Sequence, residues 1–197
     1  MSPSPYPRAR VERRCTLLAP DHAYRLIWRQ YAALPLGYVP SPSRFCDGVS
    51  FAMLYLAVDF ETALLETLVR DRFVHARRRL LPTRALSARL WATVGTVIKE
   101  HLRLLDLTGE GCTDLGAPTD AVHARNHSAG RALGRAIYRD HPDIDGFLYS
   151  SRFTGEGCFA VFDRAVWKLK LTRTGEVLEH PQLPAVLDQH QIQLNAE

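Results

Sequence analysis

The chain has 197 residues, 46% of them hydrophobic, which is enough to bury the core of one soluble domain without disulfides or metals. Its net charge is +4, from 25 Lys and Arg against 21 Asp and Glu. The basic residues are almost all arginine, 22 against 3 Lys, which suits a phosphate-bearing ligand but is equally typical of a genome rich in G and C. This composition excludes a wholly disordered chain, and the lack of any apolar run near 18 residues excludes a transmembrane helix.

The N-terminus and the cysteines indicate a cytoplasmic, reduced protein. Residues 1–14 are rich in Pro, Ser and Arg and lack an apolar stretch, so we expect a mobile tail and no signal peptide. A single domain over residues 15–197 is predicted to follow. The chain has four cysteines, Cys15, Cys46, Cys112 and Cys158. They form no C-x-x-C pair, so the sequence supports neither a zinc ribbon nor a redox motif.

The first half of the domain is predicted to contain two strands separated by a loop. Residues Tyr24–Trp28 form the first expected strand. Three prolines between Pro35 and Ser43 predict a loop. Phe51–Val58 is apolar on both alternating faces, which predicts a central strand rather than an edge strand.

A helix is predicted directly after this strand, from Asp59 to about Arg72. The Asp59 carboxylate can accept a first-turn N–H, and Glu61 complements the positive end of the helix dipole. The expected buried stripe of this helix consists of Phe60, Ala63, Leu64 and Leu68.

The second half is predicted to contain one long helix among several strands. The basic stretch 77–101, broken at Pro82, gives no clear pattern. The helix covers about Asp120–Arg139, and its Ala and Gly content allows close packing beside the apolar stripe of Ala129, Leu133, Ala136 and Ile137. Strands are expected at Leu102–Leu107, Gly146–Ser150, Cys158–Phe162 and Val166–Leu171, with a loop at 108–118 and a turn around 155–157. Because helices and strands do not alternate regularly, the predicted fold class is α+β.

Three segments together carry the strongest functional signal. Arg44, Tyr55 and Glu66 follow one another at intervals of 11 residues, and Tyr24-Arg25 precede them. The segments are Ser43-Arg44-Phe45, residues 53–57 with 62–66, and residues 145–152 with 158–162. Over roughly residues 20–165, this ordered set resembles the RES domain, a family named for its Arg, Glu and Ser.

The resemblance implies a compact mixed α/β domain similar to the ADP-ribosyltransferase fold, with NAD as the substrate in a central cleft and no metal. Family members release nicotinamide from NAD, and phosphate, water or a protein accepts the ADP-ribosyl group. Many are toxins encoded beside an antitoxin with an Xre-like helix-turn-helix domain. The expected partners are therefore NAD, inorganic phosphate and such an antitoxin, and homo-oligomer formation stays open.

Under this resemblance, Arg44, Glu66 and Ser151 are the predicted catalytic residues. Cleavage of the nicotinamide–ribose bond builds positive charge on the ribose, which a carboxylate at Glu66 can stabilise. The guanidinium of Arg44 suits the phosphates, and the Ser151 hydroxyl can hydrogen-bond the substrate.

The predicted substrate-binding residues are Arg25, Tyr55 and Tyr24. Arg25 is expected to assist Arg44 on the phosphates. Tyr55 offers a ring for the nicotinamide and a hydroxyl for the ribose.

Each of these residues also has a purely structural interpretation. Glu66 can form a solvated i,i+4 ion pair with Arg70 on the helix. Tyr55 can belong to the core, Arg44 can simply be exposed beside a Pro-rich loop, and Ser151 can merely end a strand.

The sequence departs from the family pattern at three positions. Ser43 stands where many members have glycine before the arginine. Cys46 stands where an asparagine often follows the next aromatic residue. Cys158 lies near the last core strand, where an asparagine is expected.

Other functional classes have weaker signals. His123 and His127 are four residues apart, as in a metal site, but the glutamate of H-E-x-x-H is missing. Neither a glycine-rich dinucleotide fingerprint nor a Gly-x-Ser-x-Gly elbow is present, which argues against a Rossmann dehydrogenase and an α/β-hydrolase. An arginine-rich nucleic-acid-binding module remains the alternative from another class, and its candidate residues are Arg131, Arg135, Arg139 and Arg77–Arg79.

Overall fold

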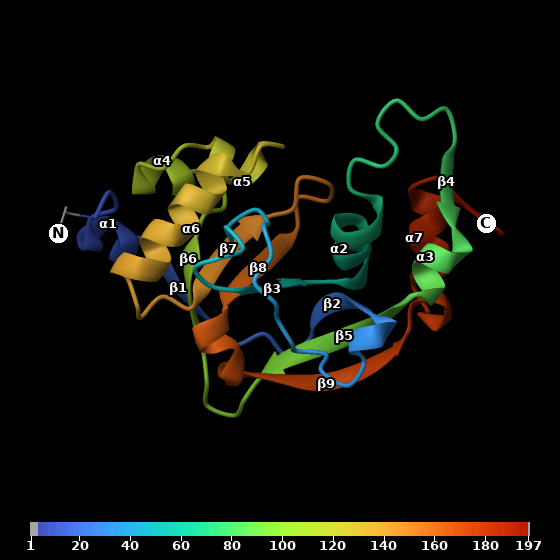
Figure 1. The fold of residues 1–197 in the computed structure, drawn as a ribbon, viewed down its shortest axis with the longest axis horizontal. Coiled ribbons are helices and arrows are strands. Elements are labelled where there is room, and N and C mark those ends of the chain that lie inside the picture. Colours follow the sequence, from blue (N-terminus) through green and yellow to red (C-terminus); the bar gives the residue numbers. More distant parts are fainter. Residues whose placement is uncertain (1–3, 197) are drawn as a thin grey trace.

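An eight-stranded mixed sheet lies at the centre of the structure, a computed structural model that describes residues 4–196 (Figure 1). The strand order is β1-β6-β7-β8-β3-β2-β5-β9, in which β6 and β7 run parallel and the other neighbours run antiparallel. The strands are β1 (Cys15–Leu18), β2 (Ala23–Trp28), β3 (Met53–Ala57), β5 (Arg89–Thr96), β6 (Leu102–Asp106), β7 (Gly146–Ser150), β8 (Gly157–Phe162) and β9 (Leu169–Glu176).

The sheet divides between β2 and β3. Strand β3 pairs with β8 over five residues, but it meets β2 at the single pair Tyr24 and Ala57. We call β1, β6, β7, β8 and β3 the larger half, and β2, β5 and β9 the smaller half. Because β2 and β3 separate beyond their one contact, an opening between the two halves is available to side chains.

The helices gather in two groups (Figure 1). Over the larger half lie α1 (Arg8–Arg13), α4 (Gly111–Leu115), α5 (Asp120–His123) and α6 (Ser128–Asp140). Towards the smaller half lie α2 (Phe60–Leu64), its π-helical continuation η2 (Leu65–Val69), α3 (Thr83–Ser87), α7 (Leu183–Gln189) and a small parallel sheet of β4 (Arg79–Pro82) and β10 (Ile192–Asn195). Three 3₁₀ turns complete the fold: η1 (Arg29–Tyr31), η3 (Asp163–Lys168) and η4 (Val177–Glu179). Within residues 4–196, no helix has the length and apolarity that a membrane crossing requires.

Strand β3 is buried on both faces, as its sequence predicts. Met53 and Ala57 belong to the large core cluster beneath the helices, whereas Leu54 and Leu56 belong to a smaller cluster on the opposite face. The mixed α+β class and the central position of β3 are therefore confirmed. The two strands predicted in the first half of the domain are present as β2 and β3. The strands predicted at residues 102–107, 146–150 and 158–162 are present as β6, β7 and β8.

Helix α2 begins where its cap predicts. The Asp59 Oδ1 atom accepts the backbone N–H of Thr62 at 2.7 Å. The predicted stripe of Phe60, Ala63, Leu64 and Leu68 is buried. The helical segment ends at Val69 rather than Arg72, because Arg70 adopts φ +42°.

Part of the N-terminal segment expected as a mobile tail forms a helix in the structure. Residues Arg8–Arg13 form α1, which buries Val11 completely. Arg8 also donates to the Asp143 carboxylate at 2.7 Å, which ties the helix to the loop after α6. The Pro, Ser and Arg composition gives no sign of these long-range contacts. Residues 1–3 of the predicted tail lie outside the described residues.

Three further expectations need correction. The predicted loop at 108–118 contains α4. The helix predicted over Asp120–Arg139 is broken between His123 and Ser128, because Ala124 is extended at ψ 150°. The strand predicted from Val166 starts at Leu169, after a 3₁₀ turn.

Candidate active site

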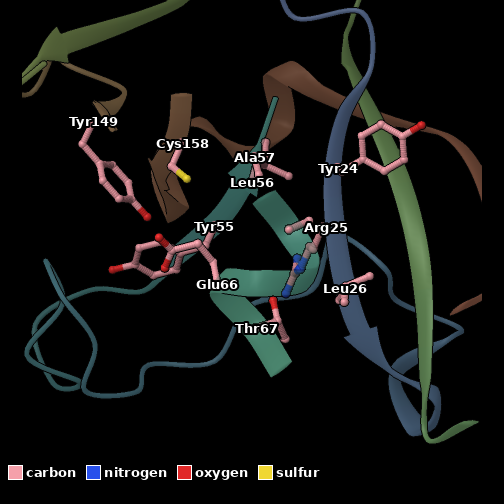
Figure 2. A pocket seen from close by; sticks show the side chains of 11 residues that line it. Tyr24, Arg25, Leu26, Tyr55, Leu56, Ala57, Glu66, Thr67, Tyr149 and Cys158 are labelled. Carbon is pink, nitrogen blue, oxygen red and sulfur yellow. The ribbon is translucent and has the colours of Figure 1, made fainter. Parts of the chain in front are cut away.

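Two neighbouring cavities share part of their lining: the inner one lies between β2 and β3, and the outer one lies between β3, η2 and the loop that carries Arg44. The outer cavity has a volume of about 310 Å³ and the inner one about 40 Å³. Both are lined by Tyr55, Glu66, Thr67 and Tyr149. Figure 2 shows the inner cavity, where these side chains converge from β3, η2 and β7. The predicted residues Arg44, Tyr55 and Glu66 are thus brought together around one hollow.

The Glu66 carboxylate is held by the predicted serine. The Ser151 hydroxyl donates to Glu66 Oε1 at 2.7 Å, and it accepts the backbone N–H of Phe153 at 3.1 Å. Ser151 is only 3% exposed, so water competes little for this contact. The surface pairing of Glu66 with Arg70 does not occur, since no ion pair within 4 Å joins them. Glu66 is therefore an oriented cavity residue rather than a solvated helix residue.

A π-helical turn presents Glu66 to the cavities. The Arg70 N–H donates to the Leu65 carbonyl at 2.8 Å, a contact five residues back instead of four. Single π turns of this kind are frequent at functional sites. Here the wider turn keeps Leu65 and Leu68 in the core while Glu66 and Thr67 line the cavities.

Arg44 reaches the outer cavity through close backbone packing against α6. A Cβ added at Gly134 would lie 1.9 Å from the Phe45 carbonyl oxygen, and one at Gly130 would lie 2.4 Å from the Arg44 carbonyl oxygen. The two glycines therefore admit the Arg44-Phe45 backbone to the helix surface, as the Ala and Gly content of this helix predicts. Arg44 lines the outer cavity together with Glu66, so it is more than an exposed loop residue.

The Arg44 side chain is anchored by one end. Its Nη1 donates to the carbonyls of Val122 and Ala124 at the C-terminus of α5. Carbonyls at a helix end are natural partners for a guanidinium. Within residues 4–196, the Arg44 Nε and Nη2 groups donate no hydrogen bond, which leaves these donors for a ligand.

Tyr55 fixes the segment that carries Arg44. Its hydroxyl lies 2.8 Å from the Ser43 hydroxyl and accepts the Phe45 N–H at 3.2 Å. Burial raises the pKa of Tyr55 to about 12, so the phenol stays protonated at neutral pH. Ser43, at a position where many family members have glycine, supplies one of these contacts. The hydroxyl is thus committed to the protein, and the Tyr55 ring is the part that lines the cavities.

Arg25 and Tyr24 lie on opposite sides of β2. Arg25 lines the inner cavity and donates to the carbonyls of Pro35 and Gly37 at 3.1 Å each. Burial lowers the pKa of Arg25 to about 10, so the side chain is still charged at neutral pH. Tyr24 belongs to the cavity wall, but its ring packs on Phe60 and points away from Glu66 (Figure 2). The substrate contact predicted for Tyr24 stays a prediction, since the residue lines the inner cavity.

Two buried groups of the inner wall were not assigned a role from the sequence. Tyr149 precedes Ser151 by two residues, and the period of two along a strand could have placed it on the same face. Burial raises the pKa of Tyr149 well above its ordinary value. Burial and the nearby Glu66 also raise the pKa of Cys158 to about 12. Cys158 is therefore a neutral thiol in the wall of the cavity.

The other sequence departure, Cys46, has a structural explanation. Its thiol donates to the Phe51 carbonyl at 3.0 Å and accepts the Gly48 N–H at 3.3 Å. The asparagine expected there could make the same pair of contacts, because an amide also both donates and accepts.

The histidine pair does not share a helix face. His123 lies in α5, whereas His127 is the N-cap of α6 and lines the outer cavity. In the part of the chain that the structure describes, no group of three or more His, Cys, Asp or Glu side chains could hold a metal ion.

The arginine stripe of α6 is largely engaged within the protein. Arg135 forms an ion pair with Asp47 at 3.6 Å, and Arg139 pairs with Asp140 at 2.6 Å. Arg131 donates to the His127 carbonyl at 3.3 Å. The ion pairs of Arg135 and Arg139 reduce the positive charge that this helix face would offer to a nucleic acid.

Comparisons with known proteins give one family model, one relative and one solved structure that are similar to this chain. The RES domain model matches residues 20–186. The probable toxin y4kH of Sinorhizobium fredii (strain NBRC 101917 / NGR234) is 34% identical over 98 residues, which cover 49% of this chain and 77% of that protein. A chain in the crystal structure of the M. tuberculosis MbcT–MbcA toxin–antitoxin complex superposes with a TM-score of 0.64 at 19% identity, covering 85% of this chain and 90% of that one.

Proposed function

This chain belongs to the RES-domain family, and we propose that it is the toxin of a toxin–antitoxin pair that consumes NAD by breaking the bond between nicotinamide and ribose. The toxin role is supported by the similarity to probable toxin y4kH and to a chain of a toxin–antitoxin complex. The proposed partner is accordingly an antitoxin with an Xre-like helix-turn-helix domain. The divided mixed sheet supports the finer assignment of the fold to the ADP-ribosyltransferase type.

The observation that carries the proposal is the arrangement around Glu66. Its carboxylate is oriented by Ser151 at 2.7 Å and shares the outer cavity with Arg44. A fixed carboxylate opposite a guanidinium matches a substrate that develops positive charge at one carbon and carries phosphates nearby.

The proposed reaction is a substitution at the first carbon of the ribose. The bond from this carbon to the pyridine nitrogen breaks, and its electron pair leaves with neutral nicotinamide. An oxygen of water or phosphate then bonds to the same carbon and loses its proton to solvent. The transition state resembles an oxocarbenium ion, as in glycoside hydrolysis. Glu66 stabilises this charge, while Ser151 keeps the carboxylate in place.

The cavities have a size and composition that suit part of such a substrate. The volume of about 310 Å³ falls in the lower range of small-molecule sites, roughly 300–1,000 Å³. The rings of Tyr55 and Tyr149 offer surfaces for a planar group, and Arg44 offers donors to the phosphates. No step requires a metal ion.

The test is product identification after incubation of the purified protein with NAD, with and without inorganic phosphate. If water is the acceptor, we expect free nicotinamide and ADP-ribose in both cases. If phosphate is the acceptor, we expect free nicotinamide and an ADP-ribose product that carries the added phosphate only when phosphate is present. NAD labelled in the adenosine half would mark a protein band if the acceptor is a protein. Unchanged NAD under all conditions, with a correctly folded sample, would refute the proposal.

A further inference from the structure

Arg70 lies at the mouth of the outer cavity in an unusual backbone conformation. It lines this cavity together with Arg44 and His127. The Arg72 N–H donates to the Val69 carbonyl at 2.8 Å, which closes a tight turn over residues 69–72. In this turn Arg70 adopts φ +42° and ψ −126°. These angles are those of the first central residue of a type II′ turn, a position dominated by glycine.

A side chain at this position is costly for the fold. A bulky residue with positive φ is a conformational outlier, and such outliers cluster at ligand clamps and active sites. Arg70 is exposed, so packing of its side chain against the core does not explain the choice of residue. The strained turn places its guanidinium at the cavity that also contains Glu66.

The mouth of the outer cavity carries an excess of positive charge. Burial lowers the pKa of His127, and the nearby charges of Arg44, Arg70, Arg131 and Arg152 lower it further. Asp71 pairs with Arg152 at 2.6 Å and lies 3.8 Å from Arg125. Among the residues that the structure describes, Arg44 and Arg70 have no carboxylate within 4 Å, although Glu66 lines the same cavity.

We infer that Arg70 is a specificity-determining residue, whose guanidinium binds the diphosphate of the ligand together with the anchored Arg44 of the same cavity. This inference rests on the proposed function, because it names the part of the dinucleotide that Arg70 selects. It predicts that the site prefers diphosphate-bearing nucleotides to nicotinamide ribosides without phosphate. Two forked guanidinium groups match the geometry of phosphate oxygens.

The chain offers a matched control in the same turn. Arg72 is also exposed, and its Nε donates to the Leu68 carbonyl at 3.2 Å. It does not belong to the lining of either cavity. Removing Arg72 therefore changes the net charge by the same amount as removing Arg70, but leaves the cavity lining intact.

The informative variant is Arg70→Gly, because glycine suits the backbone angles of this position. The variant removes the guanidinium without adding strain, so loss of folding would not be its expected effect. Thermal unfolding of both variants, compared with the parent, checks this point. We expect the melting temperature of Arg70→Gly to equal or exceed that of the parent.

The experiment measures ADP-ribose binding by calorimetry for the parent, Arg70→Gly and Arg72→Ala, together with KM and kcat for NAD. We expect binding to weaken about tenfold or more in Arg70→Gly and to stay within about twofold in Arg72→Ala. KM for NAD should rise more than kcat falls, as expected when an interaction is made equally in the ground and transition states. Equal ADP-ribose affinity of Arg70→Gly and Arg72→Ala overturns the inference, as does a parent that binds no ADP-ribose.

The two proposals fail in distinguishable ways. If the parent binds ADP-ribose through Arg70 but leaves NAD intact, the enzymatic proposal is wrong and the diphosphate site stands. If the parent cleaves NAD and Arg70→Gly has the affinity and KM of the parent, the enzymatic proposal stands and the role of Arg70 in diphosphate binding is wrong.

Discussion

The outer and inner cavities share four wall residues but differ in how their charged groups are held. In the outer cavity, Arg44 and Arg70 keep guanidinium groups within reach of solvent. In the inner cavity, the Arg25 guanidinium donates to the carbonyls of Pro35 and Gly37, and burial keeps the Cys158 thiol neutral by raising its pKa to about 12. The comparison teaches that the guanidinium of the inner cavity is committed to backbone carbonyls, whereas Arg44 of the outer cavity keeps donors for a ligand, and that Glu66 lines both cavities.

Removal of the shared carboxylate should have the largest effect. Glu66→Gln is expected to lower kcat for NAD on the order of 10²–10³-fold with little change in melting temperature, because a fixed charge opposite the developing cation is lost. Ser151→Ala should cost about tenfold, the kinetic equivalent of one hydrogen bond. Steady-state release of nicotinamide measures both. If Glu66→Gln turns over NAD like the parent, the shared wall has no catalytic role.

Overpacking at α6 should disturb the outer cavity alone. In Gly134→Ala the new methyl group meets the Phe45 carbonyl oxygen, so the segment that carries Arg44 must shift. We expect a loss of about 1–3 kcal/mol in the free energy of unfolding and a raised KM for NAD. Urea denaturation measures the first quantity. Gly109→Ala is the control, because nothing lies within 4 Å of a Cβ there and only its positive φ opposes the change.

Deletion of the Tyr55 hydroxyl should test the link between the cavities. Tyr55→Phe keeps the ring but leaves Ser43 and the Phe45 N–H without their partner. We expect the free energy of unfolding to fall by about 1–2 kcal/mol, and the affinity for ADP-ribose to fall because Arg44 is less well positioned. Chemical denaturation and calorimetry report the two effects. An unchanged affinity of Tyr55→Phe for ADP-ribose would show that the Tyr55 hydroxyl is not needed to position Arg44.

The smallest effect should come from the inner cavity at alkaline pH. Burial raises the pKa of Cys158 from 9.0 to about 12, so the unfolded chain loses this proton before the folded protein does. Stability from this group is complete below pH 9 and is lost as the pH rises towards 12. We expect about 1 kcal/mol of stability to be lost between pH 8 and 10 through Cys158. Urea titrations at pH 8 and pH 10 measure the free energy of unfolding. Cys158→Ala should lose less of it between the two pH values than the parent does, and equal losses would contradict a raised pKa of Cys158.

The sequence predicts the local elements of the site better than its long-range contacts. The apolar strand at residues 53–57 and the Asp59 cap follow from neighbouring residues alone. The meeting of Arg44 with Glu66 was expected from the family resemblance, since no local rule joins a loop to a helix. The fixation of Arg25 by the Pro35 carbonyl was not foreseen, because backbone carbonyls carry no sequence signal. The turn at Arg70 was not expected either, because positive φ at this position is typical of glycine and the residue here is an arginine.

The π turn after α2 has a consequence for the evolution of this site. A π turn amounts to one residue more than an α-helix of the same span, so it can be regarded as an insertion. Shortening the segment by one residue would rotate one end against the other by about 100°, the angle per residue of a helix. Either Leu68 would then leave the hydrophobic interior or Glu66 would swing out of reach of Ser151. Lineages that retain both partners should therefore conserve the length of this segment more strictly than its composition.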